Sequence, residues 1–312
     1  MTLLRSVSEY PLAFGGAAIS GEGAGYGFGN INEDDAKNLL EMAFLRGIRI
    51  FDTAPIYGFG LSEKRIGKAF FKNREKVFII SKSGVSWHDT KRINMTNDPV
   101  ITLKMLEQSL RDLNSDYIDL YMIHWPDDRV DIRKPLEVLA KAKHQGKIKH
   151  IGLCNTNCSD LEKASEIENI EVVQSEFNFF NQNANENLFP YLKKNKIDFM
   201  SWGTLDKGIL TGTVNSNRKF DATDCRATAP WWKKSDLLEK LDKIRPIHLI
   251  LEKEKISKLE FALLFNLSFE AITSILCGMK NLNQLNEVCD LVDYYKDKNE
   301  IKNKIQIVLA QI

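Results

Sequence analysis

Eight short apolar segments recur along this chain, and amphipathic segments separate them. They are rich in Ile, Val, Phe and Tyr and lack the alternation of half-exposed strands, which is typical of parallel strands buried on both faces. The segments are PLAFGG, IRIFDT, KVFIISK, DYIDLYMIH, KHIGLCN, EVVQSEFN, IDFMSWG and ITSILCG. Eight strand-then-helix units in 312 residues predict an α/β fold of the closed (β/α)8 type, the TIM barrel, as a single domain over residues 1–312.

The segment NEDDAKNLLEMAFLRG shows the helical pattern between two strands. Acidic residues crowd its first turn, Gly47 offers a C-terminal stop, and the apolar residues at helical spacing are Ala36, Leu39, Leu40 and Ala43. The alternative is an open doubly wound sheet, whose G-x-G-x-x-G fingerprint leads from the first strand into a helix. The glycine-rich stretch GEGAGYGFGN lacks that spacing, so the barrel is favoured.

Two long connections interrupt the regular pattern. One spans residues 83–99 after the third strand, and the other spans residues 203–246 between the seventh strand and its helix. Because long loops in compact domains are usually functional, we expect both to be active-site loops on the same rim of the barrel. The C-terminal segment NEIKNKIQIVLAQI is predicted to be a helix packed on the barrel, with an oligomer contact as the alternative use of its apolar face.

The composition excludes several classes of function. The chain carries 43 basic and 42 acidic residues, and its lysines alternate with acids, as in LEKEKISKLE, so no nucleic-acid partner is expected. No apolar run approaches the ~18 residues that a membrane span needs, which predicts a cytoplasmic protein without a membrane partner. The five cysteines form no C-x-x-C pair and the histidines are scattered, so reduced thiols and no metal site are expected.

Polar side chains stand where the predicted strands end, at the rim on which such a barrel builds its active site. Asp52 ends the second strand, with Tyr57 in the loop after it, while Lys82 ends the third strand and His124 the fourth. Each alone has an ordinary explanation, such as capping or a lysine that extends toward solvent. Together they suggest a functional cluster. A lysine at the end of VFIIS would be partly desolvated and needs a carboxylate, which Asp52 on the neighbouring strand provides.

This combination suits the polarisation of a carbonyl group without a metal. An ammonium beside a tyrosine stabilises the phenolate and lowers a pKa that is ordinarily ~10. Lys82, held by Asp52, is therefore expected to make Tyr57 a proton donor, while His124 hydrogen-bonds and orients the substrate oxygen. No side chain supplies hydride, so a coenzyme must supply it.

Three further residues at the rim suit a nicotinamide coenzyme. Asn155 ends the fifth strand and Gln174 lies in the sixth, and both could bind the carboxamide. Trp202 ends the seventh strand and offers a flat face on which the ring can stack. Ordinary pairing between polar groups at the rim is the alternative explanation for these three residues.

Five segments resemble, in order, the signature segments of the aldo-keto reductases: FDTAPIYGFGLSEKRIGKAF, SLRDLNSDYIDLYMIHWPD, GKIKHIGLCNTN, SWGTLDKGILTG and ILCGMKNLNQLNEV. The resemblance covers nearly the whole chain. It implies a barrel that binds NADP(H) in extended form at the C-terminal rim. It also implies a catalytic tetrad of Asp52, Tyr57, Lys82 and His124, with hydride passing to an aldehyde or ketone carbon while Tyr57 protonates the oxygen.

The resemblance also implies a set of coenzyme-binding residues, with some departures. The set comprises Gly16, Asp52, Asn155, Gln174, Trp202, Leu205, Lys207, Gly208, Gly278, Lys280, Gln284 and Glu287. Cys154 stands where a serine is common, Trp202 where a tyrosine is usual, and Thr204 where a proline is usual. At the last strand Gly278, Met279 and Gln284 cannot ion-pair with a 2′-phosphate, which leaves Lys280 as its candidate ligand. NADP(H) is therefore preferred and NAD(H) remains possible.

The sequence restricts the substrate only to a small-molecule carbonyl or alcohol. Candidate pocket walls are aromatic and suit a sugar face or an apolar carbonyl compound: Trp87, His88, Trp125, Trp231 and Trp232. The segment DCRATAPWW resembles the long loop of members acting on sugars and other polar carbonyls. The sequence specifies no oligomeric state.

Two other functions compete with carbonyl oxidoreduction. One is a coenzyme-binding regulatory subunit like the potassium-channel β subunits, which tend to carry an added N-terminal segment, whereas here the first strand begins by Pro11. The other is glycoside hydrolysis by Glu176 and Asp52, which Lys82 beside Asp52 disfavours.

Overall fold

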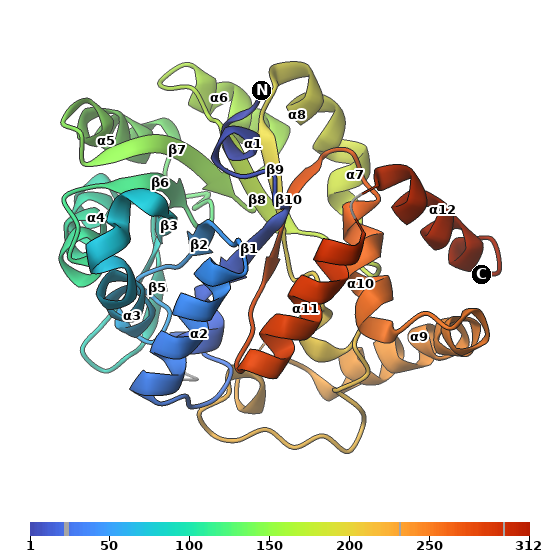
Figure 1. The fold of residues 1–312 in the computed structure, drawn as a ribbon. Coiled ribbons are helices and arrows are strands. Elements are labelled where there is room, and N and C mark those ends of the chain that lie inside the picture. Colours follow the sequence, from blue (N-terminus) through green and yellow to red (C-terminus); the bar gives the residue numbers. More distant parts are fainter. Residues whose placement is uncertain (22–24, 231, 296) are drawn as a thin grey trace.

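The computed structural model describes residues 1–21, 25–230, 232–295 and 297–312, and its centre is a closed barrel of eight parallel strands (Figure 1). Around the barrel the strands run in the order β1-β10-β9-β8-β7-β6-β3-β2. The barrel strands are β1 Leu12–Gly15, β2 Ile50–Asp52, β3 Phe78–Ser83, β6 Ile118–Ile123, β7 Ile148–Cys154, β8 Val172–Glu176, β9 Asp198–Trp202 and β10 Ile272–Cys277. The predicted barrel is thus confirmed, and each of the eight predicted segments supplies one strand.

Helices surround the strands, as Figure 1 shows. Their bounds are α1 Leu3–Val7, α2 Glu33–Leu45, α3 Leu61–Phe70, α4 Pro99–Leu113, α5 Arg133–His144, α6 Cys158–Ser165, α7 Asn183–Asn187, α8 Phe189–Asn195, α9 Lys234–Glu254, α10 Lys258–Leu267, α11 Leu282–Tyr294 and α12 Lys298–Leu309. The predicted helix at α2 is confirmed. Its N-cap is Asn32, whose side chain accepts a hydrogen bond from the Asp35 amide, and the helix ends before Gly47 at φ 94°.

The short N-terminal helix α1 covers the end of the barrel where the strands begin, which the sequence did not predict. The Leu4 side chain is 1% exposed and packs among the residues that fill the barrel interior. The Leu4 amide donates to the Asp198 carboxylate at the start of β9, at 2.7 Å. Because α1 closes this end, a substrate site has to lie at the opposite rim.

Both predicted long loops contain more regular structure than expected. Residues 83–99 include an antiparallel hairpin of β4 Val85–Trp87 and β5 Ile93–Met95. The loop assigned to residues 203–246 ends at residue 233, because α9 begins at Lys234 and Pro246 lies inside it. A proline inside a helix costs ~3 kcal/mol, but Ile244 and Ile247 on either side are buried and hold the helix in place.

The C-terminal segment forms the predicted helix, α12. Its apolar residues Ile301, Ile305 and Val308 are buried, and the helix packs on α10 and α9. It therefore lies outside the helices that cover the strands, and it covers α10, the helix that precedes β10.

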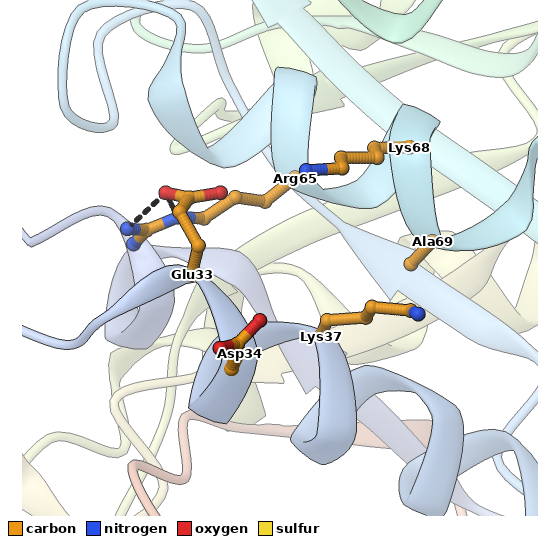
Figure 2. Close-up of a pocket in the computed structure, with 6 residues that line it drawn as sticks. All are labelled: Glu33, Asp34, Lys37, Arg65, Lys68 and Ala69. Atoms are coloured by element: carbon orange, nitrogen blue, oxygen red, sulfur yellow. Dashed lines mark hydrogen bonds and ion pairs between the residues drawn. The ribbon is translucent and has the colours of Figure 1, made fainter.

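The connection from β1 to α2 is held by Arg65 of α3. The guanidinium is 7% exposed and donates to the carbonyls of Ile19 and Ile31 and to the Glu33 carboxylate. Figure 2 shows this ion pair in a small polar depression between α2 and α3, whose other lining residues are Asp34, Lys37, Lys68 and Ala69. The depression is a surface feature around a structural arginine, and it contains none of the predicted catalytic residues.

Within the described part of the chain, no helix has the length and apolar character to cross a membrane. The same residues contain no group of three His, Cys, Asp or Glu side chains arranged to hold a metal ion. Cys154, Cys225, Cys277 and Cys289 are buried free thiols, and Cys158 is a free thiol that is partly buried.

Replacing Leu4 by alanine is expected to destabilise the barrel by about 2–4 kcal/mol, because it leaves a cavity among tightly packed interior residues. Urea unfolding followed by circular dichroism measures the change. Leu45→Ala serves as the control, since this side chain is 73% exposed, and its effect should stay within ~0.5 kcal/mol. A loss below ~1 kcal/mol for Leu4→Ala would show that α1 rests on the barrel without supporting it.

Candidate active site

A buried ion pair joins the ends of β2 and β3 inside the barrel. Lys82 Nζ lies 2.6 and 2.7 Å from the two carboxylate oxygens of Asp52, and both residues are fully buried. The ammonium also donates to the Thr53 carbonyl at 2.9 Å. Burial alone would lower the pKa of Lys82, but the adjacent carboxylate reverses that effect and holds the pKa above its ordinary value. The predicted pairing of these two residues is thus confirmed.

Tyr57 and His124 lie beside this ion pair. The Tyr57 ring centroid is 5.3 Å from Lys82 Nζ, and it lies 5.8 Å from the His124 ring in an edge-to-face arrangement. The backbone amide of His124 donates to the Ser83 carbonyl at 2.8 Å, which fixes the histidine to the end of β3. The structure therefore brings together the four residues that the sequence predicted to act together.

The expected lowering of the pKa of Tyr57 is not found. Burial raises the pKa of Tyr57 above its ordinary value, and the opposing effect of the Lys82 charge is smaller. The nearby ammonium is evident from the sequence, whereas the loss of solvent around the phenol is not. At neutral pH the phenol therefore holds its proton, as a proton donor must.

His124 is kept neutral by its surroundings. Burial lowers the pKa of His124 well below its ordinary value, and the charge of Lys82 adds a smaller lowering. A neutral imidazole can donate one hydrogen bond and accept another, so it can bind a carbonyl or hydroxyl oxygen without adding a positive charge.

Asn155 and Trp202 form a connected pair at the same rim. Asn155 has a left-handed backbone (φ 53°), which asparagine tolerates better than most residues. Its side-chain amide donates to the His124 carbonyl at 2.9 Å, and its oxygen accepts from the Trp202 indole nitrogen at 3.0 Å. The Trp202 ring is only partly buried and is fixed in orientation by this bond. The pair could hold a flat, polar ring, and each Asn155 group retains capacity for a further hydrogen bond.

Gln174 has a structural role that the sequence argument missed. Its amide nitrogen donates to Asp52 Oδ1 at 2.9 Å, so the carboxylate is held from β8 as well as from β3. The Cys154 thiol lies 3.7 Å from the Gln174 oxygen, and burial raises the pKa of this thiol, which keeps it protonated as a weak donor. This contact could have been predicted only from the strand order, which places β8 across the barrel from β2.

The turn after β9 has a strained backbone. Asp206, Lys207 and Gly208 follow one another with φ of 41°, 56° and 95°. The two non-glycine residues each cost on the order of 1–3 kcal/mol, and such strain is concentrated at ligand-binding and catalytic sites. Lys207 Nζ lies 2.9 Å from the Glu176 carboxylate. Both carboxylates of the glycosidase alternative, Asp52 and Glu176, are therefore neutralised by lysines.

The end of β10 contacts the connection between β1 and α2. Lys280 Nζ donates to the carbonyls of Phe28 and Asn30 at 2.9 and 3.2 Å. Burial is the main cause that lowers the pKa of Lys280 below its ordinary value. The Lys280 amide donates to the Gln284 side chain at 2.8 Å. Lys280 therefore supports the loop, and two of the three ammonium protons are engaged in that support.

Three further residues of the predicted coenzyme set have little contact with the tetrad side chains. Gly16 has no space for a side chain, since a Cβ there would lie 2.5 Å from Ser62 Oγ and 2.6 Å from the Asp52 carbonyl oxygen. Gly278 is exposed beside Ala18, and Glu287 is exposed on α11.

Two rim segments are joined by backbone hydrogen bonds, which could not be predicted from the sequence. The Gly29 amide donates to the Thr223 carbonyl at 3.1 Å, and the Cys225 amide donates to the Gly27 carbonyl at 2.8 Å. Arg226 secures the second segment, since it pairs with Asp224 and donates to the Lys207 carbonyl at 2.7 Å. The loop after β1 and the long loop after β9 therefore form one structure over this part of the rim.

The predicted substrate-pocket aromatics are only partly gathered at the tetrad. Trp125 is 37% exposed and lies edge-to-face with Trp202 at 6.3 Å, while Trp87 of β4 packs on Phe59 at 5.3 Å. Trp232 instead packs against Phe220 in a separate apolar cluster. Trp231 lies outside the described residues. His88 lines an open depression at the tip of the hairpin, together with Asp89, Thr90 and Arg92.

Comparisons with known proteins identify relatives over most of the chain. A model described as the Aldo/keto reductase family matches residues 11–308. The chain is 32% identical over 222 residues to the aldo-keto reductase YhdN of Bacillus subtilis (strain 168), covering 70% of this chain and 67% of that protein. It is 28% identical over 254 residues to the NADH-specific methylglyoxal reductase of Escherichia coli (strain K12), covering 77% of each.

A solved structure extends the similarity to three dimensions. The glycerol dehydrogenase AKR11B4 from Gluconobacter oxydans superposes with a TM-score of 0.80 at 28% identity, covering 96% of this chain and 91% of that chain.

Lys82→Met is expected to destabilise the protein by about 3–5 kcal/mol, because it leaves the buried Asp52 carboxylate without its cation. The double variant Asp52→Asn/Lys82→Met removes both charges and should recover much of that loss, although Gln174 keeps its hydrogen bond in either case. Chemical unfolding of the two variants and the parent protein measures the difference. Equal losses in the single and double variants would contradict an uncompensated charge as the cause.

Proposed function

Because this chain belongs to the aldo/keto reductase family, we propose that it transfers hydride between a nicotinamide coenzyme and the carbonyl carbon of a small aldehyde, ketone or sugar. The observation that carries the proposal is the cluster around Lys82. A buried lysine paired with Asp52 stands 5.3 Å from the Tyr57 ring, and a neutral His124 lies edge-on to the same ring. A protonated phenol beside a permanent cation suits protonation of a developing alkoxide.

Each residue of the tetrad has a distinct role in this proposal. The coenzyme supplies the hydride to the carbonyl carbon when it is bound. As negative charge develops on the oxygen, the Tyr57 hydroxyl gives it a proton, and Lys82 stabilises the phenolate that remains. His124 donates a hydrogen bond to the same oxygen and orients the carbonyl. Asp52 keeps Lys82 charged and in position, and it stays among the proposed coenzyme contacts.

The residues at the rim fit a nicotinamide coenzyme in extended form. Trp202 offers a partly exposed ring whose orientation Asn155 fixes, which suits stacking of the nicotinamide. The turn of Leu205, Lys207 and Gly208 combines left-handed backbone with a cation, which suits a diphosphate. The remaining proposed contacts are Gly16, Gln174, Gly278, Lys280, Gln284 and Glu287, and Gln174 would act partly through its bond to Asp52.

We assign NADP(H) as the preferred coenzyme and NAD(H) as the alternative. Lys280 keeps one ammonium proton beyond those it gives to the Phe28 and Asn30 carbonyls, and its charge is available to a 2′-phosphate. A lysine acts on phosphate as a point charge and not as a two-pronged clamp, so discrimination is expected to be moderate. The existence of an NADH-specific relative at 28% identity fits NAD(H) as the second possibility.

The substrate is proposed to be a small, polar carbonyl compound or the corresponding alcohol. The names of two relatives refer to methylglyoxal and glycerol, both small and polar. The aromatic residues nearest the tetrad, Trp125 and Trp87, could form the apolar sides of such a site, whereas Trp232 packs elsewhere.

Replacing Tyr57 by phenylalanine tests the proposed chemistry. Turnover should fall by about 10²–10⁴-fold, the usual contribution of a general acid, because the variant lacks the hydroxyl that is proposed to give the proton. The affinity for NADPH, measured by quenching of tryptophan fluorescence, should change less than about twofold. Undiminished turnover in a panel of small aldehydes and ketones would remove Tyr57 from the mechanism. Absence of turnover in the parent protein despite tight coenzyme binding would favour the regulatory-subunit alternative.

Replacing Lys280 by methionine tests the coenzyme preference. NADPH binding should weaken about tenfold, the effect of losing one charge on a phosphate, whereas NADH binding should change little. Lys37→Met, on the exposed face of α2, is the control and should bind both coenzymes normally. Equal weakening of NADPH and NADH would show that Lys280 acts only by supporting the loop at Phe28 and Asn30.

A further inference from the structure

The strained turn after β9 is attached to three different parts of the protein. The Lys207 ammonium pairs with Glu176 at the end of β8, and the Lys207 carbonyl accepts from Arg226 in the long loop. The third attachment is a hydrogen-bonded ion pair of 2.7 Å between Asp206 Oδ2 and Lys240 Nζ. Lys240 belongs to α9, a helix that otherwise lies outside the predicted site.

The Asp206–Lys240 pair supports an unfavourable backbone conformation. Asp206 has φ 41°, and its side chain is fully buried. Aspartate often tolerates left-handed backbone by hydrogen-bonding locally through its short side chain. In this chain one carboxylate oxygen is instead bonded to a distant helix, so the conformation of the turn depends on a tertiary contact.

Lys207 also lies near the Asp206 carboxylate. Lys207 Nζ is 2.9 Å from Glu176 and 3.7 Å from Asp206, so it lies between two carboxylates. A buried carboxylate without a close cation is costly, and the nearest replacement for Lys240 would be Lys207. While Lys240 neutralises Asp206, Lys207 stays with Glu176 and 5.7 Å from the Trp202 ring centroid.

We propose that Lys240 is a positioning residue for the coenzyme, because it neutralises Asp206 and thereby keeps the turn left-handed and Lys207 next to Trp202. This inference rests on the proposed function, in which the turn holds the coenzyme diphosphate. Lys240 itself contacts no reactant, and its effect falls on coenzyme affinity and not on the chemical step. Among the described residues, the charged groups facing Asp206 are Lys207 and Lys240.

The test compares Lys240→Met with the parent protein. The dissociation constant for NADPH, from tryptophan quenching, should rise about tenfold, a typical coupling between residues in one charge network. The kcat at saturating NADPH should change less than about twofold, which separates positioning from catalysis. Lys240→Arg keeps the cation and should restore most of the affinity. Lys243→Met is the matched control, because Lys243 lies on the same helix in an exposed pair with Glu239.

Two further variants keep the inference falsifiable. In Asp206→Asn/Lys240→Met the carboxylate no longer needs a cation, so Lys207 should stay with Glu176 and NADPH affinity should recover to within about threefold of the parent value. If Lys240→Met does not fold, Lys240→Gln replaces it and carries the same expectation. Parent-like affinity in the folded single variant overturns the inference, as does a double variant weaker than the single one.

Hydrogen exchange in the free protein separates this inference from the proposed function. The amides of Gly208 and Ile209 bond within the turn, to Leu205 and Asp206, at 3.0 Å each. They should exchange about tenfold faster in Lys240→Met and normally in Lys243→Met, whatever coenzyme the protein binds. Unchanged exchange overturns the role of Lys240. If the parent protein binds neither NADPH nor NADH while Lys240→Met still shows the faster exchange, the proposed function is refuted and the structural role of Lys240 stays intact.

Discussion

The buried pair of Lys82 and Asp52 is the interaction on which the arrangement of the site depends. A lysine in the interior loses its hydration, at an effective cost of several kcal/mol, and remains charged only if that loss is offset locally. Asp52 offsets it with both carboxylate oxygens, and the Thr53 carbonyl satisfies a third proton. Asp52 in turn receives the Gln174 amide from β8. The pair therefore connects three strands of the barrel, and its position is set by the closure of the sheet.

The fixed charge on Lys82 then determines the protonation of its neighbours. Together with burial, this charge lowers the pKa of His124, so the imidazole is neutral. On Tyr57 the charge opposes burial, so the pKa of the phenol is raised less than burial alone would raise it. The two rings meet edge to face at 5.8 Å. A single cation thus gives one neighbour the capacity to hydrogen-bond without charge and the other the capacity to release a proton to a strongly basic oxygen.

Features set by local pattern were predictable from the sequence, and features set by distant contacts were not. The barrel strands are continuous apolar runs, and parallel strands must end at one rim, so the grouping of Asp52, Lys82 and His124 followed from the strand ends. The role of Gln174 required knowledge of which strands face each other across the barrel. The predicted loop ended at residue 246, but α9 begins at Lys234 and passes through Pro246, since its buried neighbours Ile244 and Ile247 hold the helix. The pKa of Tyr57 was predicted in the wrong direction because burial, which sequence does not quantify, exceeds the effect of the nearby charge.

The rim opposite α1 owes its shape to cations that already have partners. Arg65 holds the start and end of the β1–α2 connection, Lys280 holds its middle, and Arg226 holds the turn after β9 through the Lys207 carbonyl. Arg65 and Arg226 also form ion pairs with Glu33 and Asp224, whereas Lys280 donates to backbone carbonyls and keeps its charge. A ligand with a negative group at Lys280 would therefore meet a cation whose position is fixed before it arrives, which lowers the ordering cost of binding. Because Lys280 also holds the loop beside it, phosphate affinity and the structure of that loop are expected to change together.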